Sequence, residues 1–301
     1  MKRYFICILS FLLVFTFTST TFAASKFTLT KQWTYKVGES SLPEKWIYHV
    51  TKNGSAFYIM GTGTGYAKMI ILSPKGKKVW STELREFHGV SKKDTLYVLD
   101  ENMKNIIEIN EQGKKISSIK YSDKALKNLT IVKPNMENWD REPSKKIVQT
   151  LEKTKLPAFI KDKKGFEKKY GKGASYYSYY TAESQGSTVY ILANYSITGT
   201  KAGKESSSHS VLFTFSKSGK YLSQKDLGDY HGADIDVSTK ENIYVSLNKR
   251  DVSKPYAIIK VLNKKNSTLK EIKLSEQSIW DGKLYKDKLY IVSDKYFYMY
   301  K

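Results

Sequence analysis

The sequence has 301 residues, and its 51 lysine and arginine residues against 29 acidic residues give a formal net charge of +22. Its single cysteine, Cys7, lies in an N-terminal apolar stretch, so the rest of the chain can form no disulfide bond and has no thiol chemistry. Arginine is scarce, which argues against base-specific nucleic-acid recognition, because that recognition depends on bidentate arginine contacts. The sequence also lacks the G-x-S-x-G, H-E-x-x-H and paired-cysteine motifs of common hydrolase and zinc sites.

Residues 1–23 have the pattern of a secretory signal peptide. Lys2 and Arg3 precede an apolar run, and Ala23 marks the expected cleavage point. The run is short for a membrane span, so no transmembrane segment is expected after cleavage. We therefore expect a secreted or extracellular location, including association with the cell wall, and one domain over residues 24–301. Removing Lys2 and Arg3 lowers the 51 basic residues to 49 against 29 acidic residues, a net charge of about +20.

The two ends of the predicted domain complement each other. Residues 28–37 resemble the last strand of a four-stranded unit, whereas residues 280–301 supply only three strands of such a unit. The N-terminal strand is expected to complete the C-terminal sheet, because this pairing removes two exposed sheet edges.

Between these ends, the chain repeats a pattern of short alternating strands that carries two aromatic residues ten positions apart. Successive copies start 39, 93, 50 and 50 residues apart, and apart from the double-length gap this is the period of four-stranded propeller blades. The repeat predicts an all-β propeller of five or six blades. The aromatic pairs are Tyr48 with Tyr58, Phe87 with Tyr97, Tyr180 with Tyr190, and Trp280 with Tyr290, while Tyr230 and Tyr244 are separated by four further residues.

Residues 69–84, MIILSPKGKKVWSTEL, resemble the repeat of quinoprotein-type β-propellers, in which a strand, a Gly-Lys turn and a Trp-bearing strand recur. Residues 105–120 and 213–227 show a weaker form of the same resemblance. The resemblance implies the fold rather than a ligand. Family members of the dehydrogenase type bind a quinone and calcium in the channel, but the sequence shows no counterpart of those sites, and no cofactor or metal is expected.

Residues 121–173 interrupt the repeat. They contain one strand-like stretch, a helix start at residues 142–144 and a strongly basic region. Two alternatives remain: a degenerate third blade that carries a helical insertion, or a plain insertion in a five-bladed ring. The basic region is expected to attract an anionic polymer through Lys161, Lys163, Lys164, Lys168 and Lys169.

The stretch that follows is unusually rich in tyrosine. Tyr176, Tyr177, Tyr179 and Tyr180 fit a strand whose aromatic side chains pack between sheets. They also fit a stacking surface for sugars or polymer chains, because tyrosine is enriched at binding surfaces.

Candidate channel residues follow the first aromatic of each repeat. These are His49, His88, Thr181, His231 and Asp281. If the first strand of each blade is innermost, these side chains converge on the channel, where imidazole and carboxylate groups could serve acid–base chemistry or bind a cation. The alternative is that they form hydrogen bonds between neighbouring blades. His209 is expected in a solvated loop, and the aspartates near His231 do not follow a calcium-loop spacing.

Three functions are compatible with these features. The first is a secreted or envelope-associated scaffold that binds a protein or an anionic envelope polymer, favoured by the lysine excess and the long polar loops. The second is a propeller enzyme or metal-binding protein, lyase-like, that uses the channel histidines. The third is a structural component of an extracellular assembly. The sequence favours the first and leaves catalysis uncertain.

Overall fold

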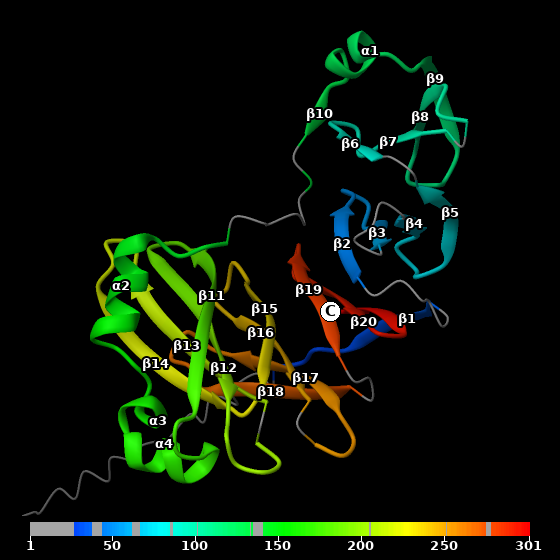
Figure 1. Cartoon of the computed structure of the whole chain (residues 1–301). Helices are drawn as coiled ribbons and strands as arrows, with labels where there is room; N and C mark the ends of the chain where they lie inside the picture. Colours follow the sequence, from blue (N-terminus) through cyan, green and yellow to red (C-terminus); the bar gives the residue numbers. More distant parts are fainter. Residues whose placement is uncertain are drawn as a thin grey trace, which may run out of the picture.

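The computed structural model describes residues 27–37, 44–61, 67–84, 87–100, 102–132, 134, 141–204, 206–250, 252–274 and 278–301. The predicted signal peptide lies outside these residues. The described chain forms five antiparallel sheets, which are called blades 1 to 5 (Figure 1). No helix among the described residues has both the length and the apolar character needed to cross a membrane.

Blades 1 and 2 are consecutive antiparallel meanders. Blade 1 contains β2 (Glu44–Val50), β3 (Ala56–Gly61), β4 (Ala67–Leu72) and β5 (Lys78–Leu84). Blade 2 contains β6 (Phe87–Ser91), β7 (Leu96–Leu99), β8 (Asn105–Ile109), β9 (Lys115–Lys120) and a fifth strand, β10 (Ile131–Val132), which pairs with β6. Helix α1 (Asp123–Lys127) lies between β9 and β10.

Blades 3 and 4 have longer strands. Blade 3 contains β11 (Ser175–Gln185), β12 (Thr188–Thr198), β13 (Ser207–Ser216) and β14 (Tyr221–Gly228). Blade 4 contains β15 (His231–Val237), β16 (Ile243–Lys249), β17 (Tyr256–Leu262) and β18 (Thr268–Leu274).

The N-terminal strand completes the last blade, as the sequence predicts. Blade 5 contains β19 (Ile279–Tyr285), β20 (Lys288–Ser293), β21 (Tyr296–Tyr300) and β1 (Lys31–Lys36), and β1 pairs with β21 from Lys36 opposite Tyr296 to Lys31 opposite Tyr300. The Trp33 ring packs over Gly76, where a Cβ atom would lie 2.6 Å from the indole. Gly76 is therefore needed both for its left-handed backbone, with φ of 73°, and for this contact between blades 5 and 1.

The core consists of separate hydrophobic clusters between adjacent sheets. One cluster joins blade 1 to blade 5, a second joins blade 5 to blade 4, a third joins blade 4 to blade 3, and a fourth joins blade 1 to blade 2. In Figure 1 the sheets accordingly follow a curve from blade 3 at the left to blade 2 at the upper right. The all-β propeller fold with a helical insertion, predicted from the repeat, is confirmed.

The remaining face of blade 3 is covered by helices rather than by another sheet. Helices α2 (Lys145–Lys153), α3 (Ala158–Lys161) and α4 (Lys163–Tyr170) follow the segment after β10. Ile147, Leu151, Phe166 and Tyr170 from α2 and α4 form one cluster with the apolar side chains of β12 and β13. The described part of residues 121–173 thus adds one two-residue strand and four short helices, and no separate sheet.

Candidate functional site

The inner strands of blades 3, 4 and 5 surround a cluster of six charged residues that are buried or partly buried. The first strands pack side by side, β11 against β15 and β15 against β19. Arg141 Nη1 lies 2.9 Å from Asp234 Oδ1, and Lys283 Nζ lies 2.7 Å from the other oxygen of the same carboxylate. Four carboxylates face two cations in this cluster, whose members are Arg141, Glu183, Asp234, Asp236, Asp281 and Lys283.

The carboxyls of the cluster differ in pKa because burial and the neighbouring charges act on them to different extents. Burial raises the pKa of Asp236 to about 7 despite the opposing effect of Arg141, and it raises the pKa of Asp281 to about 6 despite Lys283. Burial also acts on Asp234, but the charges of Lys283 and Arg141 outweigh it and lower the pKa of that carboxyl. The carboxylates of the cluster also accept hydrogen bonds from backbone amides, for example Asp281 Oδ2 from Ile47 N at 2.8 Å. The cluster therefore joins blades 3, 4, 5 and 1 through ion pairs and hydrogen bonds.

The three candidate channel histidines have different partners. His49 is buried on β2, with Nε2 3.0 Å from Asp94 Oδ1 in the β6–β7 turn of blade 2. His88 on β6 stacks on Tyr121, with ring centroids 6.1 Å apart. His231 on β15 lies beside Tyr179 of blade 3, whose hydroxyl is 3.0 Å from each ring nitrogen and bonds one of them at a time. The contacts of His49 and His231 each join neighbouring blades, which was the alternative to a channel site.

β-Bulges explain why these equivalent positions do not share a face. In β2 and β19 the bulge falls on the first repeat aromatic itself, Tyr48 or Trp280. In β6 it falls one residue later, on His88, and in β15 it falls three residues later, on Ala233. A shift of one residue turns the following side chains to the other face of the sheet, so residues at one repeat position face different directions. Thr181 lies on β11, whose pairing with β12 is uninterrupted. The described residues include no group of three histidine, cysteine or acidic side chains arranged to hold a metal ion.

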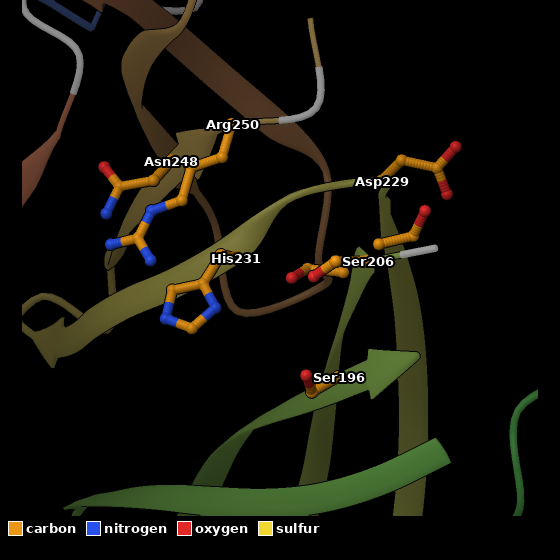
Figure 2. Close-up of a pocket in the computed structure, with 8 residues that line it drawn as sticks. Ser196, Ser206, Asp229, His231, Asn248 and Arg250 are labelled. Atoms are coloured by element: carbon orange, nitrogen blue, oxygen red, sulfur yellow. The ribbon is translucent and has the colours of Figure 1, made fainter. Parts of the chain in front are cut away.

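A cavity of about 370 Å³ lies between blades 3 and 4, and His231 is one of the residues that line it. Figure 2 shows His231, Asn248 and Arg250 extending from blade 4, with Ser196 of blade 3 below them. The other lining residues are Asp229, Ser206, Ser207 and Ser208. Burial and the nearby Arg250 charge lower the pKa of His231 to about 4, so its imidazole is neutral at neutral pH. The cavity combines hydroxyls, a neutral imidazole and a guanidinium, and it is the candidate binding site of the chain.

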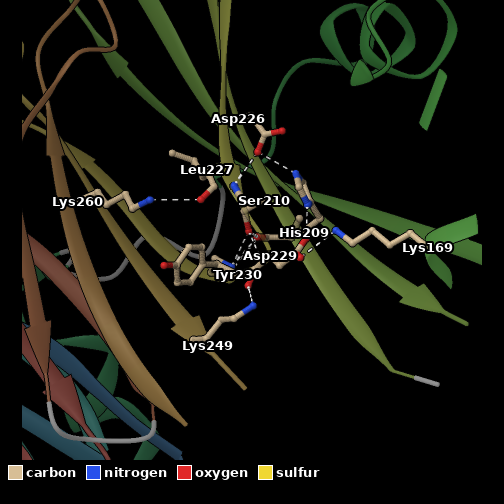
Figure 3. A network of polar contacts seen from close by, with 12 residues as sticks. Lys169, His209, Ser210, Asp226, Leu227, Asp229, Tyr230, Lys249 and Lys260 are labelled. Carbon is tan, nitrogen blue, oxygen red and sulfur yellow. Dashed lines mark hydrogen bonds and ion pairs between the residues drawn. The ribbon is translucent and has the colours of Figure 1, made fainter. Parts of the chain in front are cut away.

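The wall at Asp229 is stabilised by His209, which the structure places differently from our expectation. His209 was predicted in a solvated loop, but it is buried on β13. Its Nδ1 lies 2.8 Å from Asp229 Oδ1, and its Nε2 lies 2.9 Å from Asp226 Oδ1 (Figure 3). The error arose because the serine-rich stretch before His209 reads as a loop, whereas from Ser207 onward it continues the sheet opposite β12.

The same network links the cavity to the predicted lysine region. Lys169 Nζ on α4 donates to both oxygens of Asp229, at 2.8 and 2.9 Å (Figure 3). The five predicted lysines all lie on α3 and α4 and are exposed, namely Lys161, Lys163, Lys164, Lys168 and Lys169. Helix α4 thus places Lys169 next to the cavity wall.

The tyrosines of β11 divide between two environments because alternate residues of a strand face opposite sides. Tyr176 and Tyr180 lie on the face covered by the helices, and the Tyr176 ring contacts Phe166 and Tyr195. Tyr179 contacts His231 on the other face, and Tyr177 lies on that same face with 71% of its surface exposed. One strand therefore carries both packed tyrosines and an exposed tyrosine, and a role in stacking on sugars or polymer chains stays a prediction.

Sequence reasoning missed two buried asparagines that connect adjacent blades. Asn194 bonds both the N–H and the C=O of Gly232, and Asn248 bonds both groups of Ile279 in the same way. Each asparagine lies four residues after the second repeat aromatic of its blade, Tyr190 or Tyr244. This shared offset was the signal that could have identified them.

Comparison with known proteins adds structural similarity only. No family model matches the chain, and no curated protein matches it in sequence. Among solved structures it is similar to BamB from Moraxella catarrhalis, with 11% identity, a TM-score of 0.36, and coverage of 91% of this chain and 98% of that chain. It is also similar to the Dos1 propeller (10% identity, TM-score 0.25, covering 81% of this chain and 52% of that one) and to the WD40 domain of SCAP from fission yeast (8%, 0.20, 87% and 60%). The propeller assignment rests on the sheet topology described above.

Proposed function

We propose that this chain is an exported, envelope-associated scaffold that holds an anionic polymer on the surface formed by α3, α4 and the exposed first residues of β11, 175–177. The main observation behind this proposal is the Lys169–Asp229 ion pair, which joins the lysine-bearing helix α4 to a residue that lines the cavity. Phe166 and Tyr170 fix α4 on blade 3, so the lysines are presented by a packed helix rather than by a loose segment.

The charge of this surface suits a repetitive anionic ligand more than a specific ionic contact. Lys161, Lys163, Lys164 and Lys168 are exposed, and each is a hydrated point charge without the planar fork of arginine. Such charges attract an extended polyanion at long range and tolerate variation in its sequence. Tyr176, which is 39% exposed and lies on the face of blade 3 that the helices cover, provides aromatic surface beside α4.

The test compares two quadruple variants of the mature chain in binding to an acidic envelope polysaccharide. Replacing Lys161, Lys163, Lys164 and Lys168 with glutamine leaves the Lys169–Asp229 pair intact. The control variant replaces four exposed lysines of blade 2, Lys92, Lys93, Lys114 and Lys115. At about 0.3 kcal/mol for each exposed charge, the first variant is expected to lose about tenfold in affinity at low salt, and the control much less.

Salt provides the second arm of the test. The Debye length falls from about 10 Å at 0.1 M salt to about 3 Å at 1 M, so binding driven by the lysines should be largely lost at 1 M. Equal losses for the two variants, or binding that persists unchanged at 1 M salt, would contradict the proposal.

A further inference from the structure

The cavity between blades 3 and 4 has one available positive charge. The Asp229 carboxylate on its wall is already bonded by His209 and Lys169. The Asn248 side chain is occupied by the backbone of Ile279. Arg250 has no carboxylate within ion-pair distance among the described residues, and its side chain is exposed. A guanidinium in this state is suited to a ligand with a single negative charge, which it binds through two parallel hydrogen bonds.

The rest of the wall offers hydroxyl groups. Ser196 on β12 and Ser208 on β13 are direct partners in the sheet and face the same side. Ser206 directly precedes β13, and Figure 2 shows its side chain beside the cavity. Hydroxyls both donate and accept hydrogen bonds, so this wall matches a ligand that carries several hydroxyls of its own.

An aromatic ring completes the arrangement. Tyr177 on β11 is directly opposite Ser196, so its ring continues the row of side chains that begins with the cavity serines. The residue is 71% exposed, and exposed tyrosines at binding sites offer a flat apolar surface with a polar tip. A volume of about 370 Å³ is at the small end of ligand pockets, which run from about 300 to 1,000 Å³, and therefore suits one small unit rather than a long segment.

We propose that this cavity binds one carboxylate-bearing sugar unit, with its carboxylate on the Arg250 guanidinium, its hydroxyls on the serine hydroxyls and a ring face against Tyr177. The inference rests on the proposed function, because the unit would belong to the polymer that the lysines attract. It adds a specific contact to a surface that is otherwise selective only for charge. Asp229 disfavours a doubly charged phosphate monoester in the same place, since the second negative charge would have no partner there.

The test measures binding of short ligands by titration calorimetry in 1 M salt, where attraction by the lysines is screened. The ligands are trigalacturonic acid, the neutral trisaccharide maltotriose, and glycerophosphoglycerol as a singly charged phosphodiester without a sugar ring. Only trigalacturonic acid is expected to bind. Arg250→Gln is expected to lower its affinity by about 10- to 100-fold, as for loss of a charged hydrogen-bond pair, and Tyr177→Ala by a smaller factor.

Controls separate this inference from the proposed function. Lys254→Gln removes an exposed charge from the same β16–β17 connection and should leave the binding of trigalacturonic acid unchanged. Arg250→Lys keeps the charge but removes the planar fork, so it should bind more weakly than the natural chain. Stronger binding of glycerophosphoglycerol, equal binding of maltotriose, or indifference to Arg250→Gln would overturn the inference. The proposed function would then still be judged by the lysine variants and the polymer at low salt.

Discussion

The buried carboxyl of Asp236 provides a direct test of the central charged cluster. Its Oδ2 accepts from Leu284 N at 2.5 Å, and its Oδ1 lies 3.7 Å from Arg141 Nη2. Replacing Asp236 with asparagine preserves the shape and an acceptor oxygen for Leu284 but removes the ionisable group. The substitution therefore isolates the effect of ionising this carboxyl inside the fold.

The sign follows from the two pKa values of Asp236. The folded pKa of about 7 lies above the ordinary value of 3.8, so between these values the folded chain retains a proton that the unfolded chain has lost. The natural chain therefore loses stability as the pH rises from about 4 to 7, by 1.36 kcal/mol for each unit, and the loss is constant above pH 7. From pH 5 to pH 9 this amounts to about 3 kcal/mol, because only the two units below pH 7 contribute. Asp236→Asn should gain that amount relative to the natural chain over the same range.

The assay is urea unfolding followed by circular dichroism at pH 5, 7 and 9. Asp287→Asn is the control, because Asp287 is an exposed turn residue whose φ of 59° asparagine also adopts. The difference in unfolding free energy between Asp236→Asn and the natural chain should grow with pH, and the difference for Asp287→Asn should stay flat. Parallel loss of stability in the natural chain and in Asp236→Asn would refute the reasoning.

Three further predictions concern groups away from this cluster. Burial alone would lower the pKa of His209, but its hydrogen bonds to Asp226 and Asp229 raise that pKa above 6.5. The stability that His209 contributes is therefore full below pH 6.5 and is lost as the pH rises through the folded pKa. His209→Gln should abolish this pH dependence of the unfolding free energy in urea titrations. Asn248→Ala leaves two buried backbone groups of Ile279 unpaired and should cost about 3 kcal/mol in unfolding free energy, so a loss below about 1 kcal/mol would contradict the described role. The hydroxyl of Tyr58 is buried without a partner among the described residues, and the ring stacks on Phe297 with 4.0 Å between the centroids. Tyr58→Phe should therefore raise the unfolding free energy by about 1 kcal/mol. A decrease of that size would show that the hydroxyl is hydrogen-bonded.

The repeat in the sequence predicted the sheets because it reflects packing that recurs in each blade. Tyr58, Tyr190 and Tyr290, the second aromatics of three copies, are fully buried between sheets. The missing fourth strand at the C-terminus likewise predicted the pairing of β1 with β21, since an unpaired edge strand is unfavourable. These features depend on the alternation of apolar and polar residues and on turn residues, both of which can be recognised within a short stretch of sequence.

The candidate site could be predicted only in part because its geometry depends on positions far apart in the chain. His231 was identified, but Arg250 and the serines reach the cavity through the packing of blade 3 on blade 4. Arg141 joins the charged cluster from a segment about 90 residues before Asp234, a distance over which periodicity carries no information. The bulges also displace equivalent histidines, and nothing in the alternation of apolar residues indicates where a bulge falls.

The pairing of β1 with β21 has a consequence for the order of folding. Lys31 and Tyr300 meet although about 270 residues separate them in the chain. The entropy of closing so long a loop grows only logarithmically with its length, so the equilibrium cost is modest, but such distant contacts slow folding. Blades 1 to 4 consist of neighbouring segments and can form as the chain is produced, whereas blade 5 must await the final residues. The N-terminal strand is therefore expected to be among the last to pair, after the other blades have formed.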